Sequence, residues 1–342
     1  MPTLKFNHSI LKYMQNKNGI KYNSEEWVER MPSIGCVVEG NDEQGIEIEI
    51  FPDRTDLLSH ETIARAARSF LNSAEDSPDF EVLEGELDIT IDSSLEKIRP
   101  VILGAVVRGV DNGTNEEERD EFIQSLMEHQ EKLHMTLGRK RKFASIGVHD
   151  LSKLKPPFKV IGVKKDHSFI PLAEEKEMTI EEILKHHPKG KEYAHLMENM
   201  EKYPVIIDSD EKVLSFPPII NGNHTAVNGM TTDFFIDVTG WNERACETCL
   251  LLICLSLAER GGKVESIQLK NWNGEIFNTP RGDSKMHKVP DRLITKILGI
   301  NLKKSEIENA IKSMPQIPGR MEHIPCKCPG KVFIDYAHSP DA

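Results

Sequence analysis

Two consecutive prolines, Pro217 and Pro218, constrain the fold of this chain more than any other feature of the sequence. They lie in the stretch VLSFPPIING and remove two backbone hydrogen-bond donors in succession. A central strand needs both donors, so this stretch must form an edge strand or a rigid loop across the end of a sheet. The surrounding residues, 203–240, contain short apolar runs separated by Asp, Asn, Ser and Gly. This pattern is typical of short paired strands joined by turns.

Polar side chains flank the prolines and occupy the strand that follows them. Ser215 precedes the two prolines, Asn221 follows them, and Asp237 and Thr239 lie at the expected strand end in FFIDVTG. A rigid loop and a strand end that carry such side chains can line a polar pocket. Asn, Ser and Asp are also common in ordinary turns and strand caps. The spacing alone therefore leaves both interpretations, a pocket and a set of turns, open.

The remaining patterns predict a multi-domain α+β fold with mixed or antiparallel sheets and packed helices. With 342 residues the chain exceeds the usual size of one domain. The alternating IEIEI run at 46–50 predicts a half-buried strand. The helical period over 57–71 predicts a helix opened by a Ser59 cap, and a second period predicts a helix over 116–138. Another, strongly apolar helix is expected to end at Gly261. The polar stretch 72–80 contains a proline and is typical of a linker.

The charge and the apolar runs restrict the class of protein. A formal net charge of -12 argues against binding nucleic acid over the whole surface, but it leaves room for a local basic patch. The longest apolar run, Leu250–Leu257, is much shorter than the roughly 20 residues needed to cross a bilayer. The N-terminus has no apolar signal core. We therefore expect a cytoplasmic protein with no membrane partner.

The six cysteines do not predict a metal site. Cys246 and Cys249 form a CxxC inside an apolar helix with no second pair in reach. Burial as small hydrophobic residues is therefore favoured over zinc binding or redox chemistry. Cys326 and Cys328 also lack matching partners. In a cytosolic chain of this length all six are expected to be reduced.

A basic run, Arg139–Lys142, is the strongest candidate for binding an anion. Its four consecutive cations lead directly into an expected strand that carries His149. On an otherwise acidic chain such a run can hold the phosphates of a nucleic-acid end. The alternative is a solvated helix terminus, because cations at the C-terminal end of a helix also interact favourably with its dipole.

Several stretches, taken together and in this order, resemble the beta subunit of archaeal and eukaryotic-type phenylalanyl-tRNA synthetase. They are EIEIFPDRTDLLSHETIARAARSFL, QEKLHMTLGRKRKFASIGVHDLSKLKPPFKV, FIPL, YPVIID, VLSFPPIINGNHTAV and FFIDVTG. The resemblance covers residues 1–314, and several of the motifs are long and rare.

The resemblance implies an order of domains and a function. Residues 1–75 match the N-terminal domain, 86–268 the tRNA-editing domain, and 269–314 the partial helical start of the next domain. In the family the editing domain hydrolyses tyrosine mistakenly attached to tRNA(Phe), and the alpha subunit activates phenylalanine within an α2β2 enzyme. The implied partners are therefore the alpha subunit and tRNA(Phe). The family uses ATP and Mg²⁺, but its acidic magnesium-binding segment is absent here, so no cofactor is assigned to this chain.

The resemblance also assigns roles to individual residues. Four match positions that line the editing pocket, and three match the neighbouring basic motif: Asp237, Thr239, Ser215 and Asn221, and then Arg139, Arg141 and His149. Asp237 and Thr239 are expected to bind the tyrosyl group or orient water, and Ser215 and Asn221 to position the ester. The two arginines are expected to hold the tRNA end. No side chain stands out as a general base, so we expect a positioned water assisted by the terminal ribose hydroxyl.

The last residues, 315–342, instead resemble the entry to the C-terminal domain of Mur ligases of the MurE kind, in GRME and DYAHSPDA. Arg320 and Asp335 match residues that contact a nucleotide there. The chain has no phosphate-binding loop, so peptide ligation by this chain alone is excluded. Two alternatives to editing remain open: a non-catalytic scaffold that binds tRNA or an aromatic amino acid and, more remotely, a fragment of a Mur-type ligase.

Overall fold

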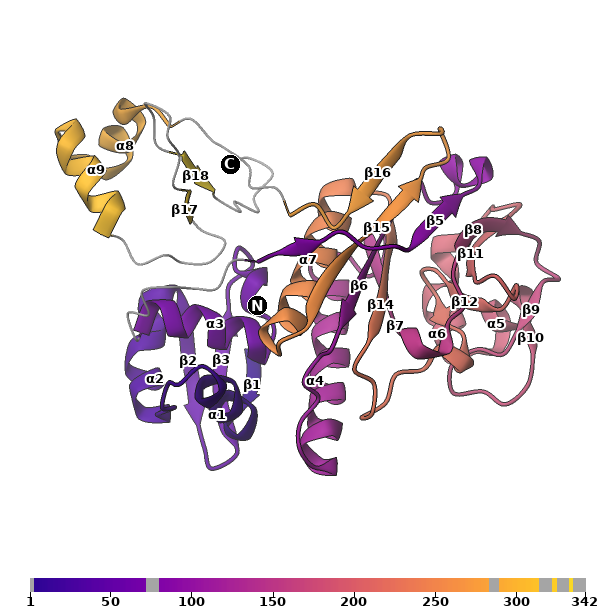
Figure 1. Cartoon of the computed structure of the whole chain (residues 1–342), viewed down its shortest axis with the longest axis horizontal. Coiled ribbons are helices and arrows are strands. Elements are labelled where there is room, and N and C mark those ends of the chain that lie inside the picture. The colour runs from indigo at the N-terminus through magenta and orange to yellow at the C-terminus, as the bar shows by residue number, and fades with distance from the viewer. Residues whose placement is uncertain (1–2, 72–79, 283–288, 314–321, 325–331, 335–342) are drawn as a thin grey trace. The chain divides into compact units, whose positions relative to one another are not determined.

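The computed structural model describes residues 3–71, 80–282, 289–313, 322–324 and 332–334 (Figure 1). The chain forms two compact units. Unit 1 comprises Met1–Asp79 with Asp283–Ala342, and unit 2 is Phe80–Gly282. Within the described ranges, no helix is both long enough and apolar enough to cross a membrane.

Unit 1 contains a three-stranded antiparallel sheet with helices. Its elements are β1 (Thr3–Asn7), α1 (His8–Lys17), α2 (Ser24–Arg30), β2 (Cys36–Asn41), β3 (Gly45–Ile50), α3 (His60–Leu71), α8 (Asp291–Leu298), α9 (Lys304–Ser313), β17 (Glu322–Ile324) and β18 (Val332–Ile334). The strand order is β1-β3-β2, and the predicted alternating run is β3, with Ile46, Ile48 and Ile50 buried. The helix predicted to open at a Ser59 cap begins at His60, and the Thr62 N–H donates to Ser59 Oγ at 3.1 Å, while Thr55–Leu57 forms a separate 3-10 turn.

The tail that resembles Mur ligases falls almost entirely outside the described residues. Arg320 and Asp335 both lie there, so the structure gives no account of them. Within this tail only β17 and β18 are described, and they pair with each other antiparallel.

Unit 2 is built on an 11-stranded mixed sheet, which confirms the predicted α+β class. Its strands are β4 (Val82–Leu83), β5 (Asp88–Ile91), β6 (Val101–Arg108), β7 (Ala144–Asp150), β8 (Phe158–Val163), β11 (Tyr203–Ile207), β12 (Val213–Phe216), β13 (Ile220–Asn221), β14 (Phe234–Gly240), β15 (Lys263–Lys270) and β16 (Ile276–Thr279). The order is β13-β12-β11-β8-β5-β15-β6-β14-β7, with β16 and β4 also pairing with β15. The predicted region 86–268 lies inside this unit, which also includes β4 and β16.

Helices and a small second sheet complete unit 2. They are α4 (Glu116–Met135), α5 (Ile180–His186), α6 (Pro188–Tyr193), α7 (Glu243–Glu259), β9 (Ser168–Phe169) and β10 (Met178–Thr179). Helix α7 packs against β6, β14 and β7, and α4 packs against β7 and α7 (Figure 1). The predicted C-terminal boundary of α7 is confirmed, since Gly261 follows it with a φ of 87°. In α7, Cys246 and Cys249 are buried, and burial raises the pKa of Cys246 to about 12.

The proline segment lies at one end of the sheet order, as predicted. Pro217 and Pro218 form the turn between β12 and the short edge strand β13. The other end of the order is β7, yet Asn221 Nδ2 of β13 donates a hydrogen bond to Val148 O of β7 at 3.3 Å. The sheet therefore curls until its two terminal strands, β13 and β7, lie next to each other. They are joined by this side-chain hydrogen bond and not by backbone pairing.

One sequence-based expectation needs correction. Asp237 was expected at a strand end, but it lies in the middle of β14, opposite Gly104 of β6 and Gly147 of β7. The whole FFIDVTG stretch pairs with β6 on one side and with β7 on the other. Its polar side chains therefore project from the face of a central strand. Alternation places Asp237 and Thr239 on the same face as Phe235, which packs in the core with Phe158.

Candidate functional site

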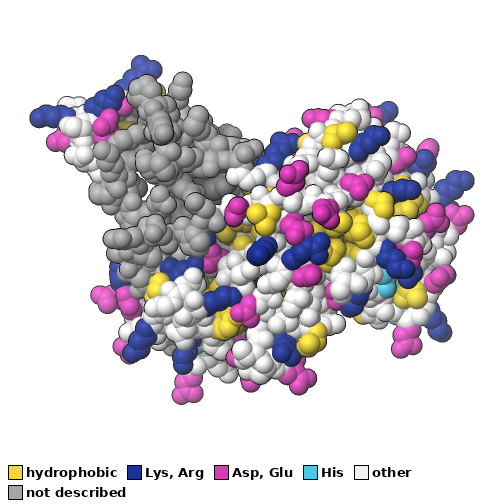
Figure 2. Space-filling model, viewed as in Figure 1, with side chains coloured by type: hydrophobic (Ala, Val, Ile, Leu, Met, Phe, Trp, Pro, Cys, Tyr) yellow, Lys and Arg dark blue, Asp and Glu magenta, His cyan; other side chains and the backbone are white. Residues whose placement is uncertain are grey.

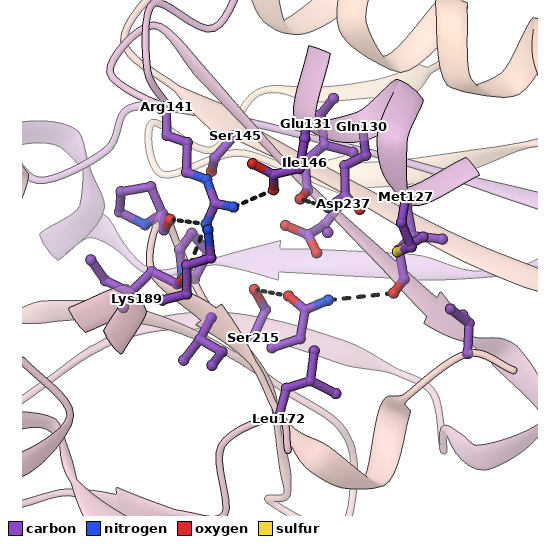
Figure 3. Close-up of a pocket in the computed structure, with 18 of the residues that line it drawn as sticks. Met127, Gln130, Glu131, Arg141, Ser145, Ile146, Leu172, Lys189, Ser215 and Asp237 are labelled. Carbon is purple, nitrogen blue, oxygen red and sulfur yellow. Dashed lines mark hydrogen bonds and ion pairs between the residues drawn. The ribbon is translucent and has the colours of Figure 1, made fainter. Parts of the chain in front are cut away.

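A cavity of about 350 Å³ lies where the two ends of the curled sheet meet. This is near the lower limit of small-molecule pockets, which are roughly 300–1,000 Å³. Its polar lining includes Arg141, Ser215, Asn221 and Asp237, and Figure 3 shows Arg141, Ser215 and Asp237 around the same hollow. Apolar side chains supply most of the remaining wall, namely Ile123, Met127, Leu172, Pro217, Pro218, Ile219, Ile220 and Val227. The cavity thus combines apolar walls with a few convergent polar groups.

A glycine makes room for Asp237 on the central strand. A Cβ atom at Gly147 would clash with Asp237 Oδ2 and would lie 2.7 Å from His149 Nε2. Any larger residue at this position would therefore displace the carboxylate. The glycine in the motif ASIGVHD is consequently a spatial requirement of the site.

A chain of hydrogen bonds between buried side chains that do not line the cavity holds Asp237 in place. His149 Nε2 lies 2.8 Å from Asp237 Oδ2, and His149 Nδ1 lies 2.8 Å from Thr225 Oγ1. Thr225 Oγ1 donates its single hydrogen to Gly222 O at 3.0 Å, so it accepts from the histidine ring. The ring therefore carries a hydrogen at Nδ1, and one further hydrogen lies between Nε2 and Oδ2. Asp237 Oδ1 has no hydrogen-bond partner among the described residues and remains available to the cavity.

A fully buried arginine, Arg99, supports the strand end beside this chain. Its Nε donates to Thr239 Oγ1 at 2.7 Å, and its Nη2 donates to Thr239 O at 2.7 Å. The same Nη2 contacts Ser145 Oγ at 3.0 Å and Arg141 O at 3.1 Å. Burial lowers the pKa of Arg99 to about 10, and the negative charge of Asp237 acts in the opposite direction. Arg99 thus connects β14, β7 and the basic run.

The basic run adopts an unusual backbone conformation. Arg139, Lys140 and Arg141 have φ values of 48°, 55° and 65°, three consecutive non-glycine residues in the left-handed region. Each such residue costs on the order of 1 kcal/mol or more, so the conformation persists only where its surroundings hold it. The Phe143 N–H donates to Gly138 O at 2.8 Å, and Arg99 binds the Arg141 carbonyl.

This turn directs Arg141 inward, where both terminal nitrogens of its guanidinium are hydrogen-bonded. Its Nη2 pairs with Glu131 Oε1 at 2.5 Å. Its Nη1 donates to Pro218 O at 3.1 Å and to Ile219 O at 3.0 Å. The guanidinium also lies 4.5 Å from the centre of the Tyr193 ring. Arg141 therefore clamps the basic run to the proline segment.

Glu131 and His134 of α4 complete this clamp. Burial alone raises the pKa of Glu131, but the hydrogen bond with His134 and the charge of Arg141 lower it to about 2. Burial lowers the pKa of His134, whose Nε2 accepts a hydrogen bond from the Ile146 N–H at 2.8 Å. The neutral ring consequently carries its hydrogen at Nδ1, which faces Glu131 Oε1 at 3.2 Å. The acceptor for Arg141 is thus a carboxylate over the whole physiological range.

The structure separates the seven candidate residues into three groups. Four line the cavity: Ser215, Asn221, Asp237 and Arg141. Thr239 and His149 are buried and do not line the cavity. Thr239 binds Arg99, and His149 binds the cavity residue Asp237. Arg139 is exposed to solvent.

Sequence reasoning missed several residues of the site. Gln130, Glu131 and Lys189 line the cavity from α4 and α6. Arg99 was missed as well, although an arginine two positions before the buried strand run VILGAVV was a usable signal. Among the described residues no group of three or more His, Cys, Asp or Glu side chains is placed to hold a metal ion.

The comparisons with known proteins define first the class and then the family. The model of the B3/4 domain matches residues 99–249. The crystal structure of an N-terminal fragment of the phenylalanyl-tRNA synthetase beta subunit from Pyrococcus horikoshii superposes with a TM-score of 0.84 at 31% sequence identity. The match covers 98% of this chain and 93% of that chain. The chain described here therefore belongs to the class of aminoacyl-tRNA synthetase subunits.

Curated relatives agree with this class and specify the family. The phenylalanine–tRNA ligase beta subunit of Methanococcoides burtonii is 43% identical over 304 residues, which cover 89% of this chain and 55% of the relative. The beta subunit of Archaeoglobus fulgidus is 41% identical over 285 residues, which cover 83% of this chain and 51% of that relative. The chain belongs to the family of phenylalanyl-tRNA synthetase beta subunits, and it spans about half the length of these relatives.

Proposed function

We propose that unit 2 hydrolyses tyrosine mistakenly attached to tRNA(Phe). The observation that carries this proposal is the convergence of Asp237, Ser215 and Asn221 on one partly apolar cavity of about 350 Å³. A synthetic site tuned for a phenyl ring cannot wholly reject the same ring with an added hydroxyl, so accuracy requires a second site. A site that hydrogen-bonds the hydroxyl discriminates strongly against the analogue that lacks it.

The geometry suggests how the cavity would act on an aminoacyl ester. The apolar wall takes the aromatic ring, and Ser215 and Asn221 position the ester; Ser215 Oγ lies 3.4 Å from Asn221 Oδ1. Asp237 Oδ1 can accept a hydrogen bond from the tyrosine hydroxyl or from the attacking water. Water attacks the ester carbonyl, the bond to the ribose oxygen breaks, and that oxygen leaves with a proton. Thr239 contributes only through Arg99 in this scheme.

Deacylation of two matched substrates tests the proposal. The purified chain is incubated with Tyr-tRNA(Phe) and with Phe-tRNA(Phe), and we expect it to release tyrosine selectively. Asp237→Asn is expected to lower the rate on the order of 10²-fold, the range for a group that acts on the transferred proton or the reacting water. Asp210→Asn, an exposed aspartate paired with Lys155, serves as the control. Equal deacylation of both substrates, or an unchanged rate in Asp237→Asn, would rule the proposal out, and binding without deacylation would indicate a scaffold.

We further propose that the chain acts in the cytoplasm with an alpha subunit that binds ATP and Mg²⁺, to form Phe-tRNA(Phe). Co-purification with an alpha subunit, followed by a mass measurement, tests the partnership.

A further inference from the structure

We propose that the exposed part of the basic run and two neighbouring aromatic rings form a platform for unpaired RNA bases at the cavity. The platform consists of Arg139, Lys140, Lys142, Phe143 and Trp241. It deepens the proposed editing function, on which it rests, by naming the surface that would hold the single-stranded end of the RNA.

The five residues come together at one end of β7 and β14. Gly240 pairs with Ala144 in the ladder between these strands. The chain continues this contact beyond the ladder, because the Trp241 N–H donates to Phe143 O at 3.1 Å and the Asn242 N–H donates to the same oxygen at 3.3 Å. Two segments almost a hundred residues apart in the sequence are thus fixed side by side.

The three cations of the platform are available to a ligand. Arg139, Lys140 and Lys142 are exposed, and within the described chain none of them forms an ion pair. Some exposed cations of unit 2 have carboxylate partners, such as Lys155 with Asp210 and Lys185 with Glu181, and unpaired ones such as Lys97 and Lys212 stand singly in the sequence. Figure 2 shows that acidic and basic side chains are interspersed over one face of the molecule. Three unpaired cations within four positions concentrate positive charge locally on a chain of net charge -12, which suits a polyanion.

The aromatic rings specify the kind of polyanion. Phe143 is 37% exposed and Trp241 is 47% exposed, although both are large and apolar. Exposed aromatic faces beside cations are the arrangement by which proteins hold single-stranded nucleic acid, with bases stacked on rings and phosphates beside lysine or arginine. An acidic peptide would use the cations but would gain little from the rings.

The backbone of the run supports a binding role. Arg139 and Lys140 have left-handed torsions, and the turn is held by the inward clamp of Arg141. Strain of this kind in a well-packed turn is associated with ligand-binding sites. Arg141 lines the cavity (Figure 3), and the residues on either side of it in the same turn, Lys140 and Lys142, are exposed, so the platform begins next to the cavity wall.

Fluorescence anisotropy with a short, unacylated, labelled single-stranded RNA tests the platform on the full chain. Trp241→Ala and Phe143→Ala are each expected to weaken binding about tenfold, the effect of losing one stacked base. Trp241→Phe keeps an aromatic face and is expected to retain most of the affinity. Ile276→Ala removes another exposed apolar side chain of unit 2, at 60% exposure, and is expected to change nothing. Lys140→Ala is expected to reduce the slope of log affinity against log salt by about 0.7, the value for one phosphate contact on a single strand.

The outcomes separate this proposal from the proposed hydrolysis. RNA binding that depends on Trp241, found in a chain that does not deacylate Tyr-tRNA(Phe), supports the platform and contradicts editing. If the chain deacylates Tyr-tRNA(Phe) selectively but Trp241→Ala and Phe143→Ala leave the RNA affinity unchanged, the platform is overturned and the proposed hydrolysis stands. An acidic peptide that binds as tightly as the RNA and is insensitive to Trp241→Ala would also overturn it.

Discussion

His149 Nε2 and Asp237 Oδ2 lie 2.8 Å apart, and both side chains are almost completely buried. The histidine does not line the cavity, so it can affect a substrate only through the orientation of the carboxylate. Since Thr225 binds the other ring nitrogen, the loop after β13 and the middle of β14 are mechanically connected through this ring.

The first prediction concerns His149 as a positioning residue. His149→Leu removes the hydrogen-bond partner of Asp237 Oδ2, and we expect deacylation of Tyr-tRNA(Phe) to fall on the order of 10²-fold in kcat, the effect of misplacing a reacting group by about 1 Å. KM should change little, because the side chain does not reach the cavity. His149→Gln keeps a donor and is expected to restore part of the rate. His186→Leu, on the surface, is the control. A change in KM alone would contradict the assignment.

The second prediction concerns the space beside Asp237. Gly147→Ala places a methyl group against Oδ2 and is expected to abolish most of the deacylation while the protein stays folded. Gly40→Ala, whose added Cβ would find its nearest neighbour at an ordinary 3.5 Å, is the matched control. Rates and circular dichroism spectra of both variants should be compared. Full activity in Gly147→Ala would show that the position of the carboxylate is unimportant.

The third prediction concerns the stability supplied by Arg99. Arg99→Met leaves the buried oxygens of Thr239, Ser145 and Arg141 without their donor. We expect a loss of about 3 kcal/mol in the free energy of unfolding, the upper range for orphaned buried polar groups. Arg108→Met breaks a half-exposed pair with Glu265 and should cost less than about 1 kcal/mol. Urea denaturation measures the free energy of unfolding of both variants. Equal losses in Arg99→Met and Arg108→Met would be inconsistent with the role of Arg99.

The fourth prediction concerns the pH dependence of the clamp. The folded-state pKa of Glu131, about 2, lies below its ordinary value of 4.5, so the unfolded chain binds more protons between these values. The stabilisation is therefore complete above pH 4.5 and is lost as the pH falls toward 2. The difference in unfolding free energy between wild type and Glu131→Gln should disappear over this window. Glu128→Gln loses a partly exposed ion pair with Lys132 and keeps an oxygen that can accept from Gln124, so it should differ little from wild type at any pH.

Local chemistry explains which elements were predictable. Two prolines have no donors wherever they occur, so the edge position of 217–218 followed from the sequence alone. The C-terminal boundary of α7 followed equally from Gly261. The start of α3 at His60 followed from the Ser59 cap, whose Oγ accepts a hydrogen bond from the Thr62 N–H at 3.1 Å.

Contacts between distant residues explain what could not be predicted. Arg99 meets Thr239 across 140 positions, and Asn221 meets Val148 across 73. The curl of the sheet that creates these contacts depends on the pairing of strands, which no local pattern specifies. Asp237 was therefore recognised as a residue of interest, while its place in mid-strand and its partner His149 required the structure.

The left-handed turn at Arg139–Arg141 has a thermodynamic consequence for any ligand that reaches it. Its unfavourable torsions are imposed when unit 2 folds, by packing that does not involve the ligand. The loss of conformational entropy is thus already complete before an encounter, and association needs no further ordering of the backbone there. A basic tail of the same composition would have to surrender that freedom each time it bound.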